Sequence, residues 1–249
     1  MNLSFPFFLI WSIIFISFSF GQNNLQESDY YLWFDTKITL ENSGLLNGTV
    51  YTEQHIMGNE KTKFFLSRGF SPGLVIYEGQ PYFDLELQYD VYSDNLLVKL
   101  PPRLGSTALK LIKRNVESFI ITDYEFRNLS EYDSEGSALR GFYEVSYTSV
   151  FFVLFTKYTK SDFERKDKGT IYYEFPFREN KYFLKYNDAY HPIKNKKDLA
   201  ALFPEYEQKI RAFYTNAKSM RRSDPHKFML ALMNHLDNLI FSVDKEIKG

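Results

Sequence analysis

Four histidines are the side chains best suited to proton transfer near neutral pH in this sequence of 249 residues, which contains no cysteine. They are His55, His191, His226 and His235. Without cysteine the chain offers no thiol nucleophile and no thiolate metal ligand. His226 and His235 fall on one predicted helix, where a separation of nine residues turns them to opposite sides. No zinc site is expected on that helix.

His191 stands close to Asp188, where a strand-rich region gives way to predicted helices. A histidine oriented by a carboxylate could serve as a general base. The sequence shows no nucleophile for it to activate, and Asn187, Asp188 and Pro192 are residues that build turns by themselves. We therefore interpret this segment as a turn. With no G-x-S-x-G, H-E-x-x-H or glycine-rich phosphate loop either, we assign no catalytic, cofactor-binding or metal-ligating residue.

Three acidic residues, Asp84, Glu86 and Asp90, share one face of a predicted strand. Calcium needs six or more oxygen atoms that converge on one point, whereas side chains along a strand face diverge. We interpret this row as the solvated face of the strand.

A compact basic cluster, Lys218, Arg221 and Arg222, lies between two predicted helices. It could contact anionic headgroups or an acidic partner. Basic side chains at a helix C-terminus also complement the helix dipole, and we favour that interpretation.

Aromatic residues are abundant: 25 Phe and 19 Tyr accompany only 2 Trp, a composition that favours strands. The two densest groups are Tyr30, Tyr31, Trp33 and Phe34, and Tyr172, Tyr173, Phe175 and Phe177. Neither group can point inward from a single strand with one buried face. Exposed members could bind a sugar, a lipid or a peptide. A sheet covered on both faces explains them more simply.

Short strands separated by turn residues are predicted for most of the chain up to Tyr190. The clearest is Phe83–Val91, whose strict alternation favours a strand that pairs with Leu96–Leu100 in a hairpin with one face in water. The other candidates are residues 30–40, 48–55, 117–122, 124–129, 141–149, 150–159, 170–177 and 181–186. Their short connections favour an antiparallel sheet, either a sandwich or a curved half-barrel.

Three helices are predicted at the C-terminal end. Asn195 can cap a helix over 196–203, Pro204 can begin a second over 205–219, and Asp224-Pro225 is a strong start for a third. The apolar stripes of these helices need a partner surface, and the sheet is the simplest one. The sequence thus predicts an α+β protein: a β-rich domain over 22–190, then C-terminal helices over 191–249 packed on the sheet.

Residues 1–21 are predicted to be a cleaved signal peptide. Phe5–Phe20 carries no charge but is shorter than the ~20 residues that span a bilayer, and Ser19 and Gly21 suit a cleavage site before Gln22. The lack of Lys or Arg ahead of the apolar run leaves an uncleaved anchor as the alternative. Export without cysteine suggests a bacterial periplasmic or extracellular protein that is soluble. A net charge of −1 gives no case for nucleic acid as a partner.

Five short segments of the sequence form a recognisable set. They are GQPYF (79–83), LQYDVYSDNL (87–96), GFYE (141–144), YFL (182–184) and YHPIKNKKDL (190–199). With them the chain resembles a set of functionally uncharacterised exported proteins from Bacteroidota. The resemblance implies secretion and a β-rich body with a helical tail, and it implies no activity. Residues 146–155 (SYTSVFFVLF) depart from the polar turn expected there.

These observations favour a non-catalytic binding or accessory protein of the bacterial envelope, with a lipid, a peptide or an envelope protein as its partner. One alternative is a hydrolase of envelope polymers, which would need two carboxylates with separated pKa values in one pocket. A second is a small outer-membrane barrel, although the chain ends in helices and in the charged residues 244–249 rather than in a lipid-facing strand.

Overall fold

A computed structural model of the chain describes residues 44–58 and 60–248, with side chains to residue 242. The predicted signal peptide, the strand predicted over 30–40 and the aromatic group at residues 30–34 lie outside the described residues.

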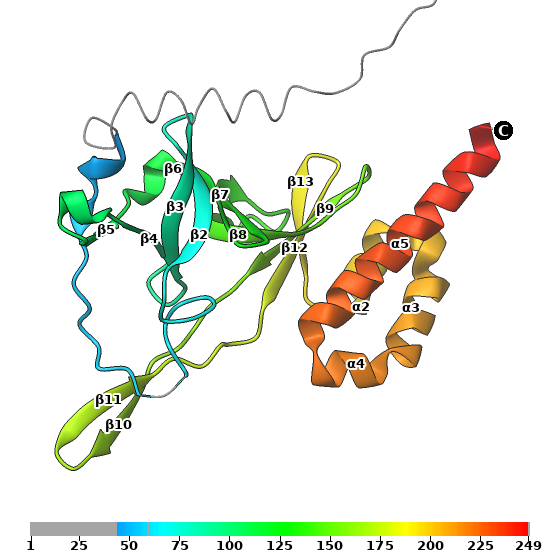
Figure 1. The fold of residues 1–249 in the computed structure, drawn as a ribbon. Coiled ribbons are helices and arrows are strands. Elements are labelled where there is room, and N and C mark those ends of the chain that lie inside the picture. Colours follow the sequence, from blue (N-terminus) through cyan, green and yellow to red (C-terminus); the bar gives the residue numbers. More distant parts are fainter. Residues whose placement is uncertain (1–43, 59, 249) are drawn as a thin grey trace, which may run out of the picture.

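Most strands form one antiparallel sheet of eleven, in the order β1-β5-β4-β3-β2-β6-β7-β8-β9-β12-β13. Its members are β1 (Thr49–Val50), β2 (Ser71–Tyr77), β3 (Gln80–Asp90), β4 (Asn95–Lys99), β5 (Ala108–Lys110), β6 (Val116–Ile121), β7 (Tyr124–Tyr132), β8 (Ala138–Thr148), β9 (Val153–Lys157), β12 (Lys181–Tyr186) and β13 (Ala189–Ile193). A separate hairpin of β10 (Phe163–Asp167) and β11 (Thr170–Glu174) projects from one end of the sheet (Figure 1). The predicted α+β class, with an antiparallel sheet followed by helices, is confirmed.

The helices lie together on one side of the sheet, beside β12 and β13 (Figure 1). They are α2 (Lys196–Leu202), α3 (Glu207–Asn216), α4 (Lys218–Ser223) and α5 (Pro225–Lys248), and short 3-10 helices span Gly44–Asn47, Pro102–Leu104, Lys113–Asn115 and Pro204–Tyr206. Within the described part of the chain, none of the helices is both long and apolar enough to cross a membrane.

Two of the predicted helix starts are confirmed by their caps. The Asn195 side chain accepts a hydrogen bond from the Lys197 amide at 2.8 Å, and the Asp198 carboxylate accepts one from the Asn195 amide at 2.8 Å. Asp224 accepts a hydrogen bond from the Lys227 amide at 2.9 Å. The helix predicted over 205–219 is instead two, α3 and α4, because Ala217 leaves helical geometry between them.

Two apolar clusters hold the fold together. The first is aromatic and lies inside the curved sheet, where the rings of Phe119 and Phe126 stack at 4.8 Å and Phe142 meets Phe119 edge-on at 5.0 Å. The second joins β9, β12 and β13 to the helices and includes Leu184 and Leu232, both fully buried. Much of the aromatic surplus is therefore core. Phe177, at 49% exposure, is an exception.

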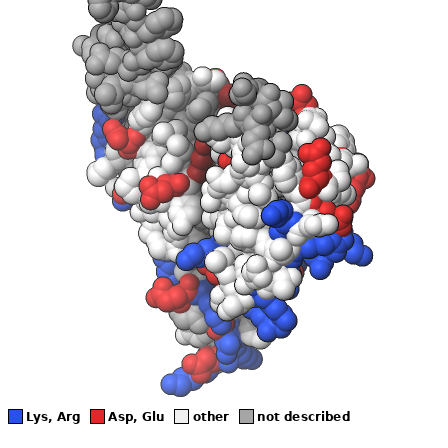
Figure 2. Space-filling model, turned by 90° about the vertical axis from the view of Figure 1, so that its right-hand side faces the viewer, with Lys and Arg blue, Asp and Glu red and all other residues white. Residues whose placement is uncertain are grey.

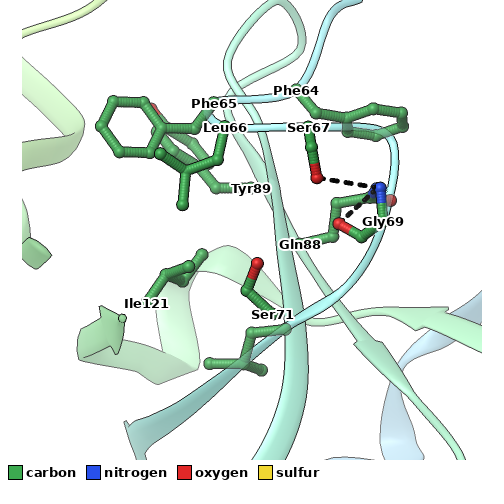
Figure 3. A pocket seen from close by; sticks show the side chains of 10 residues that line it. Phe64, Phe65, Leu66, Ser67, Gly69, Ser71, Gln88, Tyr89 and Ile121 are labelled. Carbon is green, nitrogen blue, oxygen red and sulfur yellow. Dashed lines mark hydrogen bonds between the residues drawn. The ribbon is translucent and has the colours of Figure 1, made fainter. Parts of the chain in front are cut away.

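The hairpin of β3 and β4 is confirmed, but the prediction of one face in water is wrong near its turn. Gln88 and Asp90 are buried, at 5% and 2% exposure. The Gln88 amide donates to the carbonyls of Arg68 and Gly69, and Figure 3 shows Gln88 beside Gly69. Asp90 pairs with Lys63 at 3.3 Å. The loop containing Gly69 thus covers the strand face that was expected to be wet. The cavity under this loop is about 10 Å³, room for roughly one water molecule, and too small for a ligand.

A backbone irregularity in β3 also shifts the predicted alternation. Asp84 has a φ of 51°, and the ladder to β2 shifts register between Gly73 and Val75. Tyr82 is consequently buried, while Phe83 is only half-buried. Asp84 and Glu86 remain in solvent, where Glu86 pairs with Lys99 at 2.7 Å, so the acidic row does not converge on one point.

A cleft between the sheet and the helices

A cleft of about 1080 Å³ opens where the ends of β9, β12 and β13 meet the helices. Its size is at the upper end of the ~300–1,000 Å³ range of small-molecule sites. The sheet side is lined by Asp133, Glu135, Ser137, Ala138, Leu139, Tyr143, Lys157, Thr159, Glu179, Asn180, Lys181, Tyr182, Phe183, Pro192 and Ile193, and the helical side by Lys194, Asn195, Lys196, Lys197, Tyr214, Arg221, Pro225, Phe228 and Met229.

The cleft reaches both faces of the sheet. Tyr182 and Phe183 are consecutive in β12 and therefore point to opposite faces, yet both line it. On one face Phe183 packs edge-on against Tyr143 at 5.7 Å. On the other, Tyr182 belongs to the same apolar cluster as Phe228. The cleft thus wraps around the strand ends and has an apolar, aromatic wall on each side.

Acidic groups in the cleft are largely engaged by other parts of the protein. Glu135 pairs with Lys194 at 2.7 Å, and Asp133 accepts hydrogen bonds from the amides of Glu135 and Ser137 at 3.0 and 2.7 Å. Lys157 is also neutralised, by Asp94 at 2.9 Å.

The remaining charges at the cleft are mostly positive. Lys181, Lys196 and Lys197 form no ion pair within the described residues, and Arg221 contacts the Tyr214 ring at 5.5 Å. Against these four cations, Asp133 and Glu179 are the lining carboxylates that form no ion pair in the described structure. Figure 2, which views the molecule from the side of the helices, shows Lys and Arg side chains in the lower part of that face and Asp and Glu side chains above and beside them.

The hydroxyl of Tyr182 is a buried polar group without a hydrogen-bond partner in the described structure. Burial raises the pKa of Tyr182 to about 12, assisted by the charges of Asp224 and Glu144, while the nearby Asn180 side chain offsets part of the rise. A buried hydroxyl without a partner costs stability.

A polar cluster lies on the face of the sheet toward α5. The carboxylate of Glu144, at 6% exposure, accepts a hydrogen bond from Tyr158 at 2.6 Å and one from Ser146 at 2.8 Å. Burial and the Glu144 charge hold the pKa of Tyr158 far above its ordinary value. His226 lies in the first turn of α5, with Nε2 3.7 Å from Glu144 and 3.4 Å from the Tyr158 hydroxyl.

This cluster links helix to sheet rather than forming a nucleophile site. The Ser146 hydroxyl is bonded to Glu144 and to Thr156, at 2.8 and 2.6 Å, and His226 stacks its ring on Tyr182 with centroids 6.2 Å apart. The Nδ1 atom of His226 is buried and has no partner within the described structure.

The histidines and acidic residues considered as site candidates from the sequence lie in different parts of the structure. Asn187 and Asp188 form the predicted turn, with φ values of 48° and 58°, but His191 lies beyond it in β13, paired with Leu184. The predicted turn over 187–192 is therefore wrong at its second half. His235 stacks on Phe213 at 5.1 Å. Within the described residues, no group of three or more His, Asp or Glu is placed to hold a metal ion.

The basic cluster lies on α4, where Arg221 and Arg222 occupy the last turn. Arg221 also lines the cleft, which the sequence did not indicate. His226 was considered only as a possible partner of His235, although the Asp224-Pro225 start already placed it at the first turn of a helix that must pack on the sheet.

Comparisons with protein-family models, with curated proteins and with solved structures find no match for this chain. What the cleft can bind is therefore argued from its own residues.

Proposed function

We propose that this chain is a non-catalytic binding protein of the bacterial envelope and that the cleft between the sheet and the helices holds its ligand. The observation that supports this most strongly is the cleft itself: about 1080 Å³, with aromatic walls on two sides and an excess of positive charge. Large apolar pockets with a few converging polar groups are the usual form of a ligand site.

Most carboxylates in and near the cleft are held by hydrogen bonds or ion pairs within the protein, and this favours a binding function over hydrolysis. A carboxylate-based hydrolase needs one free carboxylate and one carboxylic acid on either side of the scissile bond. In the cleft Asp133 is held by two backbone amides and Glu135 by Lys194, which leaves Glu179 as a lone candidate. Glu144 is hydrogen-bonded by Tyr158 and Ser146 behind the apolar wall.

The envelope location rests on residues 1–21 and on the absence of cysteine. Expression of the full chain in a bacterium, followed by fractionation and mass spectrometry, tests it. A periplasmic or extracellular product that begins at Gln22 supports export, and a product that retains Met1 in the cytoplasm contradicts it.

The binding role is tested with 1-anilinonaphthalene-8-sulfonate, an anionic aromatic probe that fluoresces in apolar clefts. Ala138 is exposed and lines the cleft, and Ala212 is equally exposed on α3 outside it, so each can be replaced by tryptophan. We expect the wild type and Ala212→Trp to bind the probe equally and Ala138→Trp to bind it at least about tenfold more weakly, because the indole fills the site.

Two outcomes would contradict the proposal. Equal binding by both tryptophan variants would place the probe elsewhere. Turnover of a chromogenic ester or glycoside that Ala138→Trp abolishes would make the chain an enzyme.

A further inference from the structure

Lysines from β12 and from the chain that leads into α2 line the cleft, and we call this part of its lining the basic corner: Lys181, Lys194, Lys196 and Lys197. Tyr182 pairs with Ile193 in the β12–β13 ladder, and this register places Lys181 beside Lys194, from which the chain continues directly to Lys196 and Lys197. The corner therefore combines residues from the start of β12 and the start of α2, although they are about fifteen positions apart in the sequence.

The charge of this corner is not neutralised by the protein. Glu135 neutralises Lys194, but Lys181, Lys196 and Lys197 form no ion pair in the described structure. A cationic ligand would be repelled here, and a neutral one would leave the three ammonium groups without a counter-charge. The corner is complementary to an anion.

Apolar surface continues from this corner into the cleft. Phe183 lies two positions after Lys181 in β12, so both side chains share one face, and there Phe183 packs against Tyr143. Phe228 and Met229 line the helical side of the same cleft.

The size of the cleft excludes an inorganic anion as the whole ligand. A volume near 1080 Å³ exceeds what one phosphate or carboxylate fills, so a larger body must occupy the apolar part. We infer that the ligand is a single-chain anionic amphiphile, with its carboxylate or phosphate at Lys181, Lys196 and Lys197 and its alkyl chain against the aromatic wall. This inference rests on the proposed function and names the ligand class for the same cleft.

Isothermal titration calorimetry on the full chain tests it with four probes below their micelle concentrations. Decyl phosphate and decanoate carry both the anion and the chain, decyl maltoside carries the chain alone, and inorganic phosphate carries the anion alone. We expect the two anionic amphiphiles to bind at least about tenfold more tightly than either partial probe, because each lacks one of the two interactions.

A matched pair of triple variants tests the position of the anion. Lys181→Gln with Lys196→Gln and Lys197→Gln removes the basic corner. Lys209→Gln with Lys218→Gln and Lys227→Gln removes the same charge from exposed helix positions outside the cleft. The first triple variant should lose about tenfold in affinity for decyl phosphate and nothing for decyl maltoside, and the second should bind as the wild type does.

Three results would overturn the inference. Equal affinity for decyl phosphate and decyl maltoside would show that the anionic group does not contribute to binding. Equal affinity for decyl phosphate and inorganic phosphate would show that the alkyl chain does not contribute. Equal losses in the two triple variants would show that the anion does not bind at Lys181, Lys196 and Lys197. The proposed function fails separately, when Ala138→Trp binds the fluorescent probe as the wild type does. Decyl maltoside binding that is as tight as decyl phosphate binding and is abolished by Ala138→Trp would retain the cleft and reject only the ligand class.

Discussion

The carboxylate of Asp94 occupies the space that a side chain at Gly141 would fill: a Cβ atom on Gly141 would overlap Asp94 Oδ2. Asp94 lies in the turn between β3 and β4, and Gly141 lies in β8. The same carboxylate accepts hydrogen bonds from Tyr89 at 2.7 Å and from Lys157 at 2.9 Å. Lys157 lines the cleft, so this contact fixes one wall of the proposed site to the curved part of the sheet.

Replacement of Gly141 by alanine should destabilise the protein strongly. Its φ of +88° disfavours any side chain, and the added methyl group must also displace Asp94. We expect a loss of at least about 3 kcal/mol in the free energy of unfolding, measured by chemical denaturation. Gly136→Ala is the control, since its φ of +80° is similar but its Cβ would meet nothing within 4 Å. A loss near 1 kcal/mol is expected there, and equal losses would show that Asp94 is not the obstacle.

The Asp94 carboxyl should contribute a pH-dependent part of the stability. Burial alone would raise its pKa, but the Lys157 charge and the hydrogen bonds from Lys157 and Tyr89 hold it below the ordinary value. A carboxyl whose pKa is lowered on folding stabilises the fold above its unfolded pKa of about 3.9, and this stabilisation is lost as the pH falls through the folded pKa.

Asp94→Asn should therefore cost about 3 kcal/mol at pH 7 and progressively less as the pH falls from 5 to 2. Unfolding titrations across this range measure the difference from wild type. Glu86→Gln is the comparison, because its pair with Lys99 is exposed and should be worth less than about 1 kcal/mol. A difference for Asp94→Asn that stays constant with pH would show that the charge of Asp94 is unimportant.

Two buried tyrosines should respond differently to loss of the hydroxyl. Tyr158→Phe removes a donor to the buried Glu144 carboxylate and should cost about 1–3 kcal/mol. Tyr182→Phe removes a hydroxyl that has no partner and should leave the stability unchanged or slightly higher. Similar losses in the two variants' thermal unfolding would mean that the Tyr182 hydroxyl has a protein partner.

Lys160 should make the free energy of unfolding depend on pH in mildly alkaline solution. Its buried ammonium donates to the carbonyls of Thr62 and Phe64, both at 2.6 Å, and burial lowers its pKa to about 8, with partial compensation by the Asp90 charge. Because the folded pKa lies below the unfolded value of 10.5, the cost of burying the charge disappears as the pH rises between the two values.

The Lys160 contribution to the free energy of unfolding should thus rise between pH 8 and 10, and Lys160→Met should lack this rise. Denaturation curves of both proteins at half-unit intervals measure it. Parallel pH profiles for wild type and Lys160→Met would contradict the lowered pKa.

The strands that the sequence predicts well are those with an alternating or aromatic pattern. β6, β7, β8, β11 and β12 fall in segments rich in aromatic and β-branched residues. β10 is not among the predicted strands, because all five of its residues are exposed and no buried face gives its sequence an alternating pattern. β2 contains Pro72 and Gly73, which are unfavourable in strands, and its position between β3 and β6 depends on a register shift that only the sheet shows.

A turn is expected within residues 146–155, but its apolar sequence is not, and the cause is again a tertiary contact. The chain turns at Ser149, whose amide donates to the Phe152 carbonyl at 2.9 Å, and Val150 is 88% exposed in that turn. The β8–β9 ladder also shifts register between Val145 and Tyr147. An apolar sequence thus forms a turn because a tertiary partner, the helical layer, covers the neighbouring Phe152.

The cleft could not have been found from local sequence. Lys181 and Lys197 line one cleft only through the register of β12 on β13, and Phe228 joins the lining only once α5 packs on the sheet. Helix caps and alternation are local properties, whereas the cleft depends on contacts between residues far apart in the chain. The aromatic surplus did indicate that both faces of the sheet would be covered.

The central claim, that the cleft holds an anionic amphiphile, is tested most directly by photo-crosslinking. A decyl phosphate analogue with a diazirine at the end of its chain is irradiated with the full-length protein, and the adducts are located by mass spectrometry. Adducts on peptides that contain Tyr143, Tyr182 or Phe228, competed by decyl phosphate and reduced by Ala138→Trp, are the predicted result. Adducts concentrated on exposed apolar residues elsewhere, such as Phe163 and Ile171 of the β10–β11 hairpin, would contradict it.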